Sequence, residues 1–113
     1  LLVEDDADVR GYLTRALKRL GYALEVAVNG DQALQMLQKG ETYELVLTDI
    51  VMPGKVNGIA LAHHILDTLP DTRVLCMTGY SEQLDEQLHS DMLIRKPFGS
   101  SDLANRIRLS LSR

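Results

Sequence analysis

The sequence predicts a three-layer α/β sandwich, in which helices cover both faces of one parallel β-sheet. Short apolar runs alternate with amphipathic stretches five times along the chain, which is the pattern of repeated strand–helix units. Several runs are apolar throughout rather than at every second position, as expected for strands buried on both faces. A chain of 113 residues is too short for a closed eight-fold barrel. We therefore expect one domain over residues 1–113, with an open sheet and right-handed crossovers.

The first half of the chain contains three predicted strands, at residues 1–3, 22–28 and 45–47. Gly21 is placed to end the helix after the first strand, and Gly40 is placed to end the helix before the third. Because the first strand begins at residue 1 without a lead-in, we expect a few upstream residues to be missing. The helix after the first strand is predicted from apolar side chains at helical spacing, which are Val9, Leu13, Ala16, Leu17 and Leu20.

The second half contains the predicted strands at residues 74–77 and 92–94. Asn57 is placed to cap a helix before the fourth strand, and Pro70 is placed to end it. Residues 81–90 have few apolar positions and are expected to form one of the least firmly anchored elements. Two apolar stripes predict the remaining helices: Ile59, Ala62, Ile65, Leu66 and Leu69, and then Leu103, Ile107 and Leu111.

Charge and composition exclude several functions. Twelve Lys and Arg against sixteen Asp and Glu give a formal net charge of -4, so the domain lacks the concentrated positive field that binding nucleic acid requires. The chain has no apolar run of membrane-spanning length and no signal-peptide pattern, so we expect a cytoplasmic domain without membrane contact. The single cysteine, Cys76, lies in an apolar run and is expected to be a buried hydrophobic residue.

Polar side chains stand where four of the predicted strands end. Glu4 and Asp5 follow the first strand, Asp49 follows the third, Thr78 the fourth and Lys96 the fifth. In an open parallel sheet of order 2-1-3-4-5, these strand ends are neighbours at the edge where ligands bind. We therefore expect the five side chains to converge on one pocket.

The predicted pocket has the chemistry of a metal-assisted phosphoryl site. Three clustered carboxylates repel one another, and a divalent cation offsets their charge. All the offered ligands are hard oxygen atoms, which favours Mg²⁺ or Mn²⁺ over Zn²⁺. The ammonium of Lys96 and the hydroxyl of Thr78 add groups that can hold phosphoryl oxygens. Asp6 is expected instead to cap the first helix.

Taken in their order and spacing, four segments resemble a response-regulator receiver domain. Each is modest alone, but together they cover essentially the whole chain: residues 2–6 (LVEDD), 47–54 (LTDIVMPG), 74–81 (VLCMTGYS) and 95–98 (RKPF). The resemblance implies a flavodoxin-like (βα)5 fold with sheet order 2-1-3-4-5. The segments at 52–54 (MPG) and 78–82 (TGYSE), together with Leu93, resemble those of receivers fused to hybrid sensor histidine kinases.

The resemblance implies a role for each residue of the acidic pocket. Asp49 matches the phosphoacceptor, and Asp5 matches the carboxylate that binds the metal directly. Glu4 would act on the metal through water, and the backbone carbonyl of Val51 would be a further ligand.

The resemblance also assigns Thr78 and Lys96 to the phosphoryl oxygens, and it implies a cis peptide bond between Lys96 and Pro97. One position departs from the family pattern, because Leu93 stands where many receivers have an aromatic residue that moves with the threonine. We therefore expect switching to depend on the packing of residues 81–90.

The activity that follows from the resemblance is transfer of a phosphoryl group from a partner phosphohistidine to Asp49, with Mg²⁺ or Mn²⁺ as cofactor. The partner would be a histidine kinase or a histidine phosphotransfer protein, and fusion to kinase or effector domains is open. The domain would catalyse its own phosphotransfer and dephosphorylation. It has no Gly-rich nucleotide-binding lobe of its own.

Two other readings stay open at the level of sequence. One is a degenerate receiver that acts only as a protein-interaction module, against which the intact set of Asp5, Asp49, Thr78 and Lys96 argues. The other is a flavodoxin-like ligand binder. Such a protein needs a phosphate-binding loop after the first strand, where this chain instead has three carboxylates that would repel a phosphate.

Overall fold

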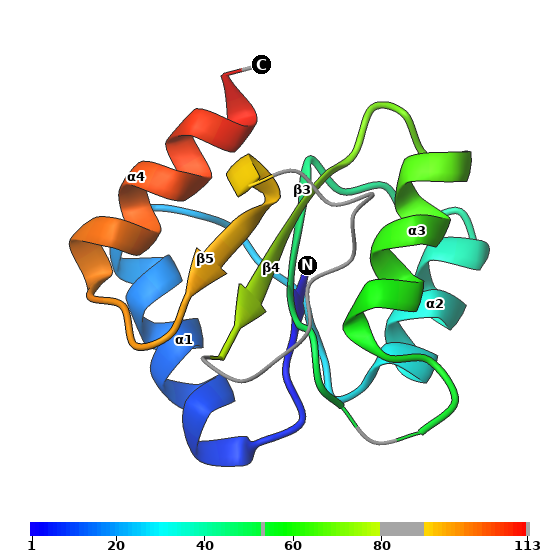
Figure 1. The fold of residues 1–113 in the computed structure, drawn as a ribbon, viewed down its shortest axis with the longest axis horizontal. Helices are drawn as coiled ribbons and strands as arrows, with labels where there is room; N and C mark the ends of the chain where they lie inside the picture. Colours follow the sequence, from blue (N-terminus) through cyan, green and yellow to red (C-terminus); the bar gives the residue numbers. More distant parts are fainter. Residues whose placement is uncertain (53, 80–89, 113) are drawn as a thin grey trace.

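The computed structural model describes residues 1–52, 54–79 and 90–112. It contains a five-stranded parallel sheet of order β2-β1-β3-β4-β5, which confirms the predicted order (Figure 1). The strands are β1 (Leu2–Val3), β2 (Val26–Ala27), β3 (Leu45–Asp49), β4 (Arg73–Thr78) and β5 (Leu93–Arg95).

Helices cover both faces of the sheet. Those described are α1 (Ala7–Arg19), α2 (Gly30–Gln38), α3 (Gly58–Thr68) and α4 (Ser100–Leu111), with a short 3-10 helix, η1 (Ser90–Met92), before β5. Figure 1 shows α1 and α4 on one face and α2 and α3 on the other. Of the element expected over residues 81–90, residues 81–89 lie outside the described residues. The three-layer sandwich is therefore confirmed.

Two apolar clusters, one on each face of the sheet, explain why the strand sequences are apolar at successive positions. On one face, side chains of the strands pack with those of α1 and α4: Leu2, Leu47, Leu75, Met77 and Ile94 with Leu13, Leu17, Leu103 and Ile107. On the other face they pack with α2 and α3: Val3, Val46, Val74 and Cys76 with Ala33, Leu37, Leu61, Ala62 and Ile65. The strands β1, β3, β4 and β5 therefore bury successive side chains on opposite faces of the sheet.

Several predicted boundaries and helix faces are wrong in detail. Only Val26–Ala27 of the run at residues 22–28 forms a strand, because Tyr22 and Leu24 instead pack against the α1 and α4 cluster as partly buried side chains. Met92 belongs to η1 rather than to β5.

Three residues placed on the buried stripes are exposed: Val9 and Leu66 lie toward the solvent side of α1 and α3, and Leu20 is the C-cap residue after α1. Val9, Leu20 and Leu66 are 38%, 41% and 40% exposed. On α3 it is Leu61 that takes the buried position next to Ala62.

The predicted helix caps are confirmed. Oδ1 of Asp6 accepts hydrogen bonds from the amides of Asp8 and Val9, at 2.9 and 3.2 Å. The side chain of Asn57 accepts one from the amide of Ala60 at 2.9 Å. The peptide bond between Lys96 and Pro97 is cis, as expected.

Within the described ranges, no helix is long and apolar enough to cross a membrane.

Candidate functional site

The sheet brings the predicted site residues to its carboxyl edge. Asp49 is the last residue of β3 and is paired with Met77 of β4, which places Thr78 one residue further along the neighbouring strand. Thr78 is in turn paired with Arg95 of β5, and its carbonyl accepts a hydrogen bond from the amide of Lys96 at 2.8 Å. The register of three adjacent strands therefore puts Asp49, Thr78 and Lys96 at one edge.

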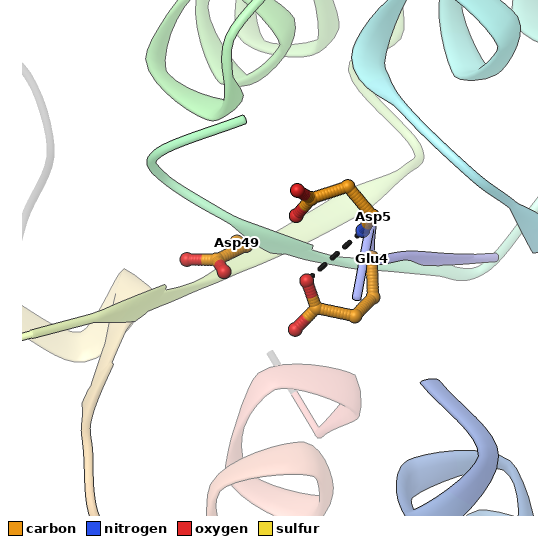
Figure 2. A group of neighbouring side chains, drawn as sticks. All are labelled: Glu4, Asp5 and Asp49. Carbon is orange, nitrogen blue, oxygen red and sulfur yellow. Dashed lines mark hydrogen bonds between the residues drawn. The ribbon is translucent and has the colours of Figure 1, made fainter. Parts of the chain in front are cut away.

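The turn after β1 completes an acidic cluster at this edge. Glu4, Asp5 and Asp49 each offer a carboxylate oxygen, and these atoms lie within 4.8 Å of one another (Figure 2). Glu4 and Asp49 are buried, whereas Asp5 is exposed. The carboxylate of Glu4 folds back on its own turn, where Oε2 accepts hydrogen bonds from the amides of Asp5 and Asp6 at 3.0 and 3.5 Å.

Burial and neighbouring charge make Glu4 a weak acid. Its pKa is raised from 4.5 to about 7, and loss of solvation on burial is the largest cause, followed by the negative charge of Asp49. The bond between Oε2 and the amide of Asp6 opposes this shift, as does the charge of Lys96. Near neutral pH the Glu4 carboxyl is therefore partly protonated.

Asp49 has one oxygen that is paired and one that is available. Oδ2 accepts a hydrogen bond from the Lys96 ammonium at 2.9 Å, which forms an ion pair. Oδ1 is buried, and among the described residues it has no hydrogen-bond partner. A buried carboxylate oxygen without a donor is costly, so Oδ1 is suited to a cation or to bond formation with an electrophile.

Thr78 and Val51 are the other two predicted site residues. Among the described hydrogen bonds, none joins either of them to the Asp49 carboxylate. Thr78 is buried, and its hydroxyl donates to the carbonyl of Gly79 at 3.2 Å. Val51 lies two residues past Asp49 with a side chain that is 60% exposed. The expected contacts of Thr78 with a phosphoryl group, and of the Val51 carbonyl with a metal, stay predictions. Leu93 is buried in β5.

Sequence analysis missed several residues that hold the site in place. Nη1 of Arg10 donates to the carbonyls of Glu4 and Asp5, at 2.8 and 3.3 Å. Gly58 begins α3 so close to β3 that an added Cβ would overlap the Asp49 carbonyl oxygen. The available signals were a basic residue one turn into the helix after the acidic pair, and a glycine directly after the capping Asn57.

A second glycine, Gly30, performs a similar function at the loop after β3. An added Cβ at Gly30 would overlap the carbonyl oxygen of Val56. Next to it, Oδ2 of Asp31 accepts a hydrogen bond from the amide of Lys55 at 3.3 Å. The start of α2 therefore packs directly on the loop that follows Asp49.

The donor set of the acidic cluster fits a small, hard divalent cation. It consists of carboxylate oxygens, and one of these, Asp49 Oδ1, is buried without a donor among the described residues. A cavity of about 370 Å³ lies at the opposite, amino edge of the sheet and is lined by Leu1, Leu24 and Leu45 among others. The described residues of the carboxyl edge present charged groups, and nothing in them favours a flavodoxin-like ligand binder.

This fold, with an acidic cluster and a lysine at the carboxyl edge of a 2-1-3-4-5 sheet, defines a receiver-type α/β domain. The family model for the response regulator receiver domain matches residues 1–108. The chain belongs to the response-regulator receiver family, whose members work with histidine kinases or phosphotransfer proteins.

Individual relatives agree with this assignment. The chain is 38% identical to the response regulator receiver protein CpdR of Brucella abortus, over 98% of this chain and 94% of that protein. It is 37% identical to the transcriptional regulatory protein CpxR homolog of Haemophilus influenzae, over 100% of this chain but only 50% of that protein. The chain thus spans about half the length of several curated relatives that it matches.

A solved structure agrees on the fold. The N-terminal domain of a response regulator/sensory box/GGDEF 3-domain protein from Carboxydothermus hydrogenoformans superposes with a TM-score of 0.86. The match covers 98% of this chain and 91% of the other, at 22% sequence identity.

Proposed function

We propose that Asp49 accepts a phosphoryl group from a phosphohistidine of a histidine kinase or phosphotransfer protein. The observation that carries this proposal is the state of the Asp49 carboxylate. Its Oδ2 is paired with Lys96, while its buried Oδ1 has no hydrogen-bond partner among the described residues. One oxygen is thus fixed in position and the other can act as a nucleophile.

The transfer is a single displacement at phosphorus. A new bond forms between a carboxylate oxygen of Asp49 and phosphorus, while the bond between phosphorus and the imidazole nitrogen breaks, and the leaving imidazole takes up a proton. The ammonium of Lys96 and the hydroxyl of Thr78, which belong to the same edge of the sheet, would hold phosphoryl oxygens. Attack of water on the acyl phosphate later regenerates the carboxylate.

We propose Mg²⁺ or Mn²⁺ as the cofactor. Asp5 and Asp49 would bind it directly, the Val51 carbonyl would be a third ligand, and Glu4 would act through water. This last role fits Glu4, because its Oε2 already accepts bonds from two amides. When bound, the cation supplies positive charge against the three carboxylates and the transferred phosphoryl oxygens.

The signal would pass on through a change of conformation, because the added phosphoryl group brings a charge of about -1.5 to -2 to a buried site. The face that would change is the one formed by β5 and α4. We propose a cytoplasmic location. Some relatives are about twice the length of this chain, so fusion to an effector domain or to a hybrid histidine kinase is part of the proposal.

The test uses a small-molecule phosphodonor. The protein is incubated with phosphoramidate or acetyl phosphate and Mg²⁺ and then weighed intact. We expect the mass gain of one phosphoryl group, and we expect it to be lost with a chelator or in Asp49→Asn. The control Asp67→Asn removes an exposed carboxylate on α3 and should react as the wild type does. A wild-type protein that gains no mass would indicate a degenerate receiver instead.

A further inference from the structure

We infer that Arg10 is a positioning residue for the metal site, because its guanidinium fixes the turn that presents Asp5 to Asp49. The inference rests on the proposed metal-dependent function. It is carried by two hydrogen bonds, from Nη1 of Arg10 to the carbonyl oxygens of Glu4 and Asp5, at 2.8 and 3.3 Å. Hydrogen bonds from a charged donor are stronger than those between neutral groups.

The position of Arg10 on α1 explains how it reaches the turn. Its amide donates to the carbonyl of Asp6 at 2.8 Å, so it lies one turn into the helix. Helical side chains lean toward the helix N-terminus, which directs the guanidinium back to the residues between β1 and α1. The helix is itself anchored in the core by Leu13 and Leu17. Arg10 therefore ties the turn to a rigid element.

The turn needs such a tie because the charges of the acidic cluster act on Asp5. Asp5 and Asp6 are exposed, and the carboxylate of Asp5 stands close to those of Glu4 and Asp49. Repulsion within the metal-free cluster pushes Asp5 outward. Two groups oppose this movement: the Glu4 carboxylate holds the amides of Asp5 and Asp6, and Arg10 holds the carbonyls of Glu4 and Asp5.

Removal of the Arg10 side chain should affect metal binding in opposite directions, depending on whether Arg10 acts by positioning the turn or only by its charge. A cationic side chain near a cation site weakens binding by repulsion, so its removal should strengthen binding. If Arg10 positions the turn, its removal should instead weaken binding, because Asp5 is no longer held beside Asp49. Loss of a group that orients a metal ligand costs about 10-fold or more in metal affinity.

The experiment compares two variants of α1 that lose the same charge. Arg10→Met removes the two bonds to the turn, and Arg15→Met removes an exposed arginine further along the same helix. Mn²⁺ is titrated into each folded protein and free Mn²⁺ is measured by electron paramagnetic resonance. We expect Kd to rise about 10-fold in Arg10→Met, and to stay unchanged or fall slightly in Arg15→Met. Equal or tighter binding by Arg10→Met would overturn the inference.

A second measurement works without metal and separates this inference from the proposed function. Amide hydrogen exchange is followed in the metal-free proteins. The amides of Asp5 and Asp6 should exchange faster in Arg10→Met than in wild type or Arg15→Met, while those of Leu13 and Leu17 stay protected and show that α1 is folded. Unchanged exchange at Asp5 and Asp6 contradicts the role of Arg10. Failure of the wild type to bind Mn²⁺ contradicts the metal site instead.

Discussion

Lys96 and Asp49 are 47 residues apart in the sequence, and the Nζ of Lys96 lies 2.9 Å from Oδ2 of Asp49. This ion pair joins β3 to the residue after β5 across the intervening β4. It offsets one negative charge of the acidic cluster and leaves Oδ1 available. The proposed chemistry rests on this difference between the two carboxylate oxygens of Asp49, one paired with Lys96 and one available.

The first prediction concerns Lys96→Ala. Metal binding should be retained or become tighter, because the variant removes a positive charge that competes with the cation. The rate of phosphorylation should fall by about 100-fold, because a donor to the developing phosphoryl charge is lost. Calorimetry gives the first quantity and intact mass against time gives the second. Lys39→Ala, which removes an exposed lysine at the end of α2, is the control, and loss of metal binding in Lys96→Ala would contradict the assignment.

The second prediction is that Mg²⁺ stabilises the fold. A cation that binds only the folded state should add about 2.7 kcal/mol to the free energy of unfolding at 100 times its Kd. Asp5→Asn should lose most of this gain, and without Mg²⁺ it should melt at a higher temperature than wild type because repulsion is relieved. Thermal melts with and without Mg²⁺ measure both effects. Equal stabilisation of wild type and Asp5→Asn would argue against a metal site at Asp5.

The third prediction concerns pH. The pKa of Glu4 is about 7 in the folded protein and near 4.5 in the unfolded chain, so between these values the folded state binds more protons. The contribution of Glu4 to the free energy of unfolding is therefore fully present below pH about 4.5 and is lost as the pH rises through about 7. Urea unfolding of the metal-free protein at several pH values should show this decline, and Glu4→Gln should flatten it. A wild-type decline that Glu4→Gln leaves intact would assign the effect to another group.

A related consequence is that metal binding should release protons in the same pH range, because the cation favours the ionised carboxylate. Calorimetry of Mg²⁺ binding in two buffers of different ionisation enthalpy measures the number released. The number should fall toward zero above the pKa of Glu4 and in Glu4→Gln.

The fourth prediction concerns Gly58 at the start of α3. Because a Cβ there would overlap the Asp49 carbonyl oxygen, Gly58→Ala should lower the free energy of unfolding by about 1–3 kcal/mol and slow phosphorylation. Gly11→Ala is the matched control. It lies inside α1 with only the end of the Arg15 side chain nearby, so it should be neutral or add about 0.5–1 kcal/mol. Equal effects of the two variants on chemical denaturation would remove the special role of Gly58.

Much of the fold was predictable from sequence, because strands buried on both faces and helices with one apolar stripe have distinct patterns. The caps at Asp6 and Asn57 followed from residue types that favour helix starts, and the sheet order followed from the resemblance to a receiver domain. The acidic cluster at the carboxyl edge followed from the polar residues at the predicted strand ends. The length of β2 was not predictable, because Tyr22 and Leu24 are apolar to fill the core beneath α1 rather than to pair in the sheet.

The supports of the site were not predictable in the same way. The contacts of Arg10 with the turn and of Gly58 with the Asp49 backbone depend on how closely helices approach strand ends. The distance between a helix and a strand end is set by the packing of the whole core, and no periodic pattern in the sequence indicates it.

The central claim is that Asp49 forms an acyl phosphate, and locating the modified residue tests it most directly. The protein is phosphorylated with phosphoramidate and Mg²⁺, reduced with borohydride and digested, because borohydride converts an aspartyl phosphate to homoserine. Fragment masses then show which residue has changed. We predict homoserine at position 49 and at no other carboxylate. Homoserine at position 5 with Asp49 unchanged, or a phosphate that resists borohydride on a serine or threonine, would contradict the account.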